Sequence, residues 1–63
     1  MTLISIINVN GIKEWFDPLA VTAVRERRDA FAATIISLAG NSFVDTNDSI
    51  DDVANRINKL LND

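Results

Sequence analysis

Four side chains that carry oxygen alternate near the end of the chain, at Asp45, Asn47, Ser49 and Asp51. Calcium-binding loops supply their ligands in this alternating way. Here Ile50 stands where such a loop requires glycine, and Arg56 occupies the position of the closing glutamate. We therefore favour a simpler interpretation, in which these residues cap a helix and solvate a turn. The sequence predicts no metal site.

A cluster of basic side chains, Arg25, Arg27 and Arg28, has the chemistry to bind phosphate or nucleic acid. Acidic residues within and beside the cluster dilute its charge. Phe31 is the only aromatic residue near enough in the sequence to stack on a base. We favour a solvated strand end and turn for this segment.

Trp15 and Phe16 are adjacent, so on a strand their side chains point to opposite faces. One ring can enter a core, and the other is then left at an edge. Tryptophan is enriched among interface hot spots, and the sequence leaves open whether Trp15 belongs to a core or to an interface. The candidate interface residues are Trp15, with Arg25 and Arg27 at its rim, and Phe31.

The chain contains no histidine, cysteine or tyrosine. It therefore lacks the imidazole, thiol and phenol groups on which most nucleophilic and metal-hydroxide catalysis depends. Carboxylates, Lys13, Lys59 or arginines would have to carry any reaction, and no arrangement of them stands out. We expect a protein that is not an enzyme and has no cofactor.

Length and charge narrow the class of protein further. The 63 residues make one domain, residues 1–63, with a net charge of −3. Negative charge argues against nucleic acid and anionic membranes as partners, because both attract basic surfaces. No apolar run approaches the length of a membrane span, and the start of the chain lacks the basic segment of a secretory signal. We expect a cytoplasmic protein.

The first third of the chain predicts a β-hairpin. Residues 3–9 are β-branched and apolar on both faces, which is typical of a strand covered on both sides. Asn10-Gly11 follows, and this pair favours a type I′ turn because both residues tolerate positive φ. Residues 12–16 then form a short edge strand, in which Lys13 and Glu14 discourage further pairing.

Residues 17–40 allow two interpretations. Asp17-Pro18 and Gly40 have the chemistry of helix ends, and the alanine-rich run between them is compatible with one long helix. No apolar stripe runs through that helix, so we favour two strands, residues 21–27 and 31–38, with a turn at Asp29-Ala30. A second hairpin turn at residues 39–41 leads into a strand at residues 42–45.

The clearest element is an amphipathic helix from Ser49 to Leu61. Ser49 is a good N-cap, with acidic residues in the first turn and Lys59 in the last. The sequence therefore predicts an α+β fold, a small antiparallel sheet of about five short strands followed by one helix packed on it. The apolar stripe of the helix is formed by Ile50, Val53, Ala54, Ile57, Leu60 and Leu61.

Six stretches of the chain carry turn and core patterns that match a known family. They are Ile4-Ser-Ile-Ile-Asn-Val-Asn-Gly11, Lys13-Glu-Trp-Phe-Asp-Pro18, Val21 to Glu26, Thr34-Ile-Ile-Ser-Leu-Ala-Gly40, Phe43-Val44 and Ser49-Ile-Asp-Asp-Val53. These stretches resemble the FlbD (SwrD) family of small cytosolic proteins associated with flagella and swarming, which has a strand ending in Leu-Asn-Gly, an Asn-Pro step, an Ile-Glu strand, a Thr-Ile-Thr-Leu-x-x-Gly hairpin and a C-terminal helix. This chain departs from the family at Asp17-Pro18 and in the alanine-rich residues 30–33. The resemblance implies fold more than role, and a phage or mobile-element relative is an alternative.

The functional expectation is a non-enzymatic protein-interaction or adaptor module that acts as a homo-oligomer. One helix can cover only one face of a sheet, so the other face would expose apolar side chains to be buried against a second copy or an unidentified protein. One alternative is a small RNA-binding regulator of CsrA-like architecture. Another is a phage-encoded inhibitor that sequesters a host protein or a small nucleotide.

Overall fold

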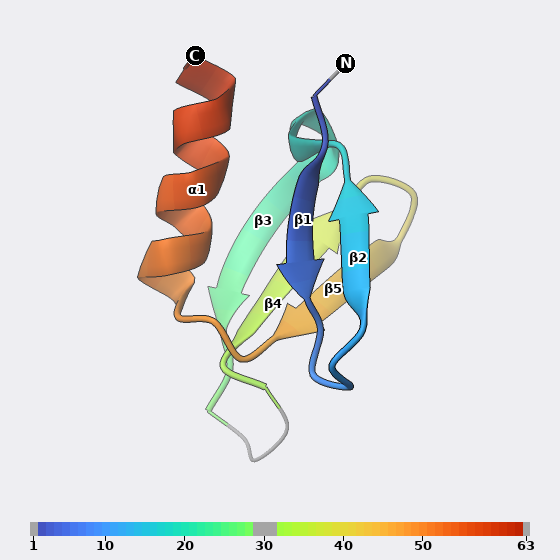
Figure 1. Cartoon of the computed structure of the whole chain (residues 1–63), viewed down its shortest axis with the longest axis vertical. Helices are drawn as coiled ribbons and strands as arrows, with labels where there is room; N and C mark the ends of the chain where they lie inside the picture. The colour runs from blue at the N-terminus through green and yellow to red at the C-terminus, as the bar shows by residue number, and fades with distance from the viewer. Residues whose placement is uncertain (1, 29–31, 63) are drawn as a thin grey trace.

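Five short antiparallel strands and one C-terminal helix form the expected α+β fold (Figure 1). A computed structural model describes residues 2–28 and 32–62. The strands are divided between two sheets, a β1–β2 hairpin and a three-stranded sheet in the order β3–β4–β5. The elements are β1 (Ile4–Ile7), β2 (Lys13–Phe16), the 3-10 helix η1 (Pro18–Ala20), β3 (Val21–Glu26), β4 (Thr34–Leu38), β5 (Ser42–Thr46) and α1 (Ile50–Asn62).

The β1–β2 turn differs from the expected type I′ turn. Gly11 has a φ of 79°, but Asn10 is not among the described residues with positive φ. The loop contains residues 9–11, one residue more than a type I′ turn has. The hydrogen bond that closes it runs from the N–H of Asn8 to the carbonyl of Ile12, at 2.9 Å. The side chain of Asn8 also accepts bonds from the N–H groups of Asn10 and Ile12. This local side-chain bonding fixes the longer loop.

Asp17-Pro18 does begin a helix, but the helix lasts a single turn. The carboxylate of Asp17 accepts a hydrogen bond from the N–H of Leu19 at 2.9 Å, and Pro18 is the first helical residue. From Val21 the chain is extended and pairs with β4. The alternative of one helix over residues 18–39 is therefore wrong, because the apolar side chains there fit a strand facing the core.

The three-stranded sheet follows the expected order with shorter strands. β3 ends at Glu26, and β4 begins at Thr34 rather than at residue 31. The turn expected at residues 29–30, and Phe31, lie outside the described residues. The β4–β5 connection contains Gly40 with a φ of 85° and Asn41 with a φ of 63°. The consecutive positive φ values expected in the first turn thus occur in the second.

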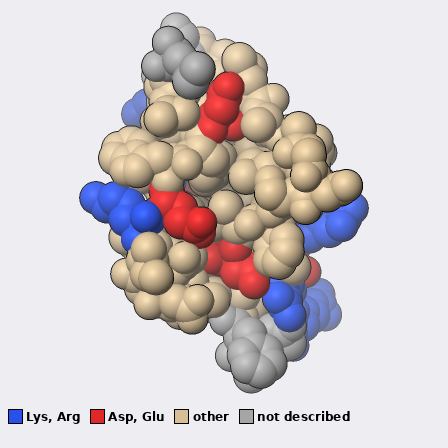
Figure 2. All heavy atoms as spheres, turned by 90° about the vertical axis from the view of Figure 1, so that its right-hand side faces the viewer, with Lys and Arg blue, Asp and Glu red and all other residues tan. Residues whose placement is uncertain are grey.

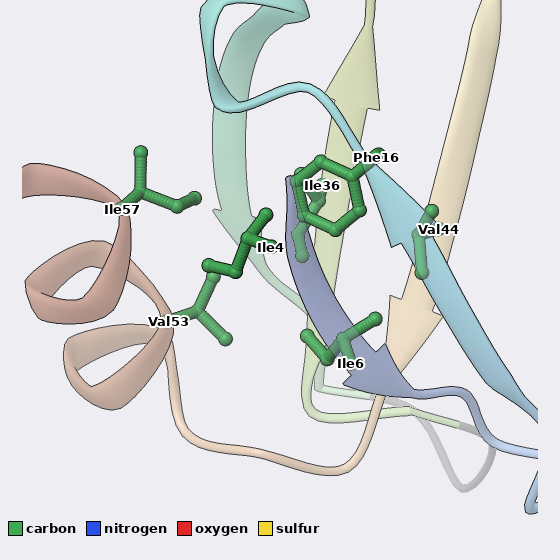
Figure 3. Close-up of a cluster of buried hydrophobic side chains, with 7 residues drawn as sticks. All are labelled: Ile4, Ile6, Phe16, Ile36, Val44, Val53 and Ile57. Atoms are coloured by element: carbon green, nitrogen blue, oxygen red, sulfur yellow. The ribbon is translucent and has the colours of Figure 1, made fainter. Parts of the chain in front are cut away.

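The core lies between the two sheets and the helix (Figure 3). The hairpin supplies side chains from its inner face, the three-stranded sheet supplies side chains from β4 and β5, and α1 supplies two from its apolar stripe. Figure 3 shows side chains from all these elements converging on one cluster. The buried members are Ile4, Ile6, Phe16, Ile36, Val44, Val53 and Ile57.

β1 is covered on one face only, so the expectation of a strand buried on both faces is wrong. Ile4 and Ile6 are buried, whereas Leu3 and Ile7 are 44% and 48% exposed. The reason is the division into two sheets. β1 packs inward on the core, and no second layer lies over its other face among the described residues.

Two fully buried threonines join β4 and β5 to their surroundings. The hydroxyl of Thr46 donates to the carbonyl of Ile7 at 2.9 Å and accepts from the N–H of Asp48. The hydroxyl of Thr34 donates to the carbonyl of Asp48 at 2.7 Å. Ser49 then caps α1, as expected, by accepting from the N–H of Asp52. The threonines therefore fix the chain that leads into the helix.

Ile57→Ala should lower the free energy of unfolding by about 2–5 kcal/mol, because Ile57 is buried in the shared core and the surrounding side chains can fill the cavity only in part. Asp52→Ala, on the exposed side of the same helix, should cost less than about 1 kcal/mol. Denaturant midpoints measure both. A larger loss for Asp52→Ala would contradict the assignment of helix faces.

Thr46→Val should lower the free energy of unfolding by about 1–3 kcal/mol, because it leaves two backbone groups without their hydroxyl partner in a buried position. Thr22→Val is the matched control. Thr22 is exposed, and its hydroxyl donates to the carbonyl of Ser37 at 3.3 Å. Chemical denaturation should separate the two variants, and equal stabilities would show that the Thr46 hydroxyl has no special role.

Candidate functional site

Two of the four alternating oxygen-bearing residues, Asp45 and Ser49, have separate structural roles. Asp45 lies in β5 and pairs with Arg27, whereas Ser49 caps α1. Within residues 2–28 and 32–62, no three histidine, cysteine, aspartate or glutamate side chains are grouped so as to hold a metal ion. Ser49 therefore caps the helix, as the sequence predicted for this residue.

The outer face of the β1–β2 hairpin carries several exposed apolar side chains on two paired strands. Cross-strand pairing places Ser5 opposite Trp15 and Ile7 opposite Lys13, and Leu3 continues the same face of β1. Trp15 is 60% exposed, and the ammonium nitrogen of Lys13 lies 6.0 Å from the centroid of its ring. We call this surface the hairpin face: Leu3, Ser5, Ile7, Lys13 and Trp15.

The placement of the two adjacent aromatic rings follows the alternation of the strand. Phe16 enters the core, while Trp15 points outward. Of the two roles that the sequence left open for Trp15, a place in the core is therefore wrong. Its ring lies outside the core and is available for an intermolecular contact.

A second candidate surface is a hollow of about 480 Å³ on the outer side of the three-stranded sheet. Arg25, Arg27, Phe43 and Asp45 are among the residues that line it. A guanidinium nitrogen of Arg27 lies 3.5 Å from one carboxylate oxygen of Asp45. The other carboxylate oxygen of Asp45 is buried and has no hydrogen-bond partner among the residues that the structure describes. The hollow therefore combines an aromatic ring with two arginines, of which Arg27 is paired with the one carboxylate in the lining.

The expected interface residues do not form one surface. Arg25 and Arg27 line the sheet hollow, Trp15 lies on the hairpin face, and Phe31 is outside the described residues. Arg28 does not line the hollow, and its guanidinium lies 3.5 Å from the carboxylate of Glu26 in an exposed pair. The basic cluster is thus divided between two ion pairs and one exposed arginine.

Several exposed apolar side chains in the described part of the chain lie outside the expected set. Besides Leu3 and Ile7 on the hairpin face, they are Ile12, Leu19, Phe43 and Leu61. Phe43 is 63% exposed and Leu19 is 79% exposed. Side chains alternate between the two faces of β5, so Phe43 faces outward because its neighbour Val44 is buried.

Figure 2 shows the side of the molecule along β2 and β5, where acidic groups form a broken column and basic groups lie toward the rims.

Comparison with protein-family models, with curated proteins and with solved structures found no match to this chain. No helix in the described part of the chain has both the length and the apolar character needed to cross a membrane.

Arg27→Gln should lower the free energy of unfolding by about 1 kcal/mol, since it removes the charged partner of a partly buried carboxylate. Arg28→Gln is the matched control, because its ion pair with Glu26 is largely exposed and should contribute almost nothing. Thermal or urea unfolding compares the two variants. Equal effects would mean that the Asp45 carboxylate is well solvated without Arg27.

Proposed function

We propose that this protein is a non-enzymatic protein-interaction module that acts as a homo-oligomer. The observation that supports this best is the hairpin face, where Leu3, Ile7 and Trp15 lie on one side of two paired strands and remain exposed. Exposed apolar patches of this kind are typical of sites that bind other proteins. Tryptophan, with Lys13 beside it, is also the type of residue that anchors such sites.

Energetics favour a second copy as the first partner. Full burial of a large apolar side chain contributes about 1.5–3 kcal/mol, which is substantial for a domain of this size. Such small domains commonly gain stability from disulfides, metals or self-association, and this chain has no cysteine for the first route. Closed twofold dimers are the commonest oligomers, so we propose a homodimer.

The resemblance to the FlbD (SwrD) family supports an adaptor role for this oligomer, in which a further protein partner binds in the cytoplasm. The RNA-binding alternative has less support. Two arginines of the basic cluster, Arg27 and Arg28, are paired with carboxylates, and phosphate binding requires available positive charge. The inhibitor alternative has no distinguishing observation in its favour.

Sedimentation equilibrium at micromolar concentration tests the proposal. The wild-type chain should sediment above its monomer mass of 6.9 kDa. Trp15→Ser should weaken self-association by about tenfold or more, as expected for loss of a hot-spot tryptophan. Leu19→Ser is the control, because Leu19 is even more exposed but lies outside the hairpin.

A folded wild-type protein that remains at the monomer mass over the whole concentration range would overturn the homo-oligomer. Equal weakening by Leu19→Ser and Trp15→Ser would place the contact away from the hairpin face. Circular dichroism of each variant confirms that the chain is still folded.

A further inference from the structure

The two edges of the β1–β2 hairpin differ. On the β1 edge, the carbonyl of Ser5 accepts a bond from the guanidinium of Arg56 in α1 at 2.7 Å. The carbonyl of Ile7 accepts from the hydroxyl of Thr46, and the N–H of Val9 donates to the carbonyl of Asp45 at 3.2 Å. The helix and β5 therefore close the β1 edge.

The same bonds fix which backbone groups of β2 point outward. In an antiparallel pair, residues alternate between positions bonded to the partner and positions directed away from it. Because Ser5 and Ile7 direct their carbonyls away from β2, the residues opposite them, Trp15 and Lys13, direct theirs away from β1. The structure gives these outward groups no partner in residues 2–28 and 32–62.

The β2 edge is thus an open pairing edge beside the exposed Trp15. Figure 1 shows β2 on the right of β1, so this edge lies toward the side of the molecule seen in Figure 2. Open edges of this kind bind extended strands through main-chain hydrogen bonds. A strand that binds to this edge must also offset the positive charge of Lys13, which repels a strand without a negative charge opposite it.

We propose that the occupant is β2 of a second copy, paired antiparallel about a twofold axis at Trp15. This inference rests on the proposed homo-oligomer and specifies how its copies meet. It joins two hairpins into a four-stranded sheet. The two Trp15 rings then lie side by side on one face, and Leu3 and Ile7 stay on the outer strands of that face.

Charge disfavours two of the other registers that the outward backbone groups allow. An axis at Lys13 would place the two Lys13 side chains opposite each other, and an axis at Glu14 would oppose the two glutamates; both are repulsive. An axis at Trp15 places Lys13 opposite Asp17 of the second copy, twice by symmetry. The opposite charges of Lys13 and Asp17 at both ends of the pairing thus favour a second copy as the partner and an axis at Trp15 as the register.

A mixed disulfide tests the register, because the chain has no native cysteine. In the proposed pairing, residues 13 and 17 of different copies are opposite each other, with Cα atoms about 5.5 Å apart, which suits a disulfide. Mixing Lys13→Cys protein with Asp17→Cys protein under mild oxidation should give a cross-linked heterodimer. Lys13→Cys alone should not cross-link efficiently, since its two copies would lie roughly 13 Å apart along the strands.

A second pair of variants tests the backbone bonds themselves. Lys13→Pro removes an outward N–H that has no partner in residues 2–28 and 32–62, so it should leave the fold intact and raise the dimer dissociation constant by about tenfold or more. Lys13→Ala is the control for the lost charge, since it keeps the N–H, and it should weaken the dimer less. Sedimentation equilibrium measures both, with circular dichroism to verify folding.

The outcomes separate this inference from the proposed function. A wild-type chain that is monomeric at all concentrations overturns the proposed homo-oligomer and this pairing with it. A wild-type dimer that forms no mixed disulfide, or that Lys13→Pro weakens no more than Lys13→Ala does, overturns the β2 pairing alone. If Lys13→Pro fails to fold, the mixed disulfide decides.

Discussion

All elements of this fold meet in one core, and each strand can turn only one of its two faces toward it. The core draws on the hairpin, the three-stranded sheet and the helix together, so the loss of any one element would expose the others. Side chains alternate between faces along a strand. Once Ile4 and Ile6 are committed to the core, Leu3 and Ile7 must face outward. The exposed hairpin face is therefore a direct consequence of how the core is shared.

The buried hydroxyls of Thr34 and Thr46 determine how the remaining elements are arranged around that core. Both are bonded to Asp48, directly before the helix begins, and Thr46 also reaches the hairpin at Ile7. Buried hydroxyls require such partners, so the geometry is narrowly defined. It orients α1 so that Arg56 reaches the carbonyl of Ser5. The closed β1 edge and the open β2 edge both follow from this arrangement.

The sequence was most informative where one residue has one local role. The stripe positions Val53 and Ile57, the cap at Ser49 and the turn at Gly40 all have chemistry that acts within a few residues, and the structure confirms them. The Asn10-Gly11 hairpin also forms, but with a longer loop than the expected type I′ turn. It was least informative where the outcome depends on distant neighbours. An apolar run such as residues 3–9 does not reveal how many layers will cover it, which depends on elements later in the chain.

The candidate site shows the same limit. Alternation separates Trp15 from Phe16, but only the packed structure decides which ring enters the core. The proximity of Arg25, Arg27 and Arg28 in the sequence suggested one basic cluster. The fold divides it, because Asp45 reaches Arg27 from β5, whereas Arg28 pairs with Glu26. Phe43 becomes visible as a surface residue only once the partner face of β5 is known to be buried.

The apolar side chains of the hairpin face are only partly covered by residues 2–28 and 32–62. Leu3 and Ile7 contribute little to the core from their outward positions, and polar β-formers such as threonine would pair in the strand equally well. The hairpin is also short, and two strands alone are marginally stable in water. A pairing that adds strands to the hairpin and brings the two Trp15 rings together would stabilise its weakest element. Trp15, which is 60% exposed in the monomer, is therefore the residue of the hairpin face that this pairing would use.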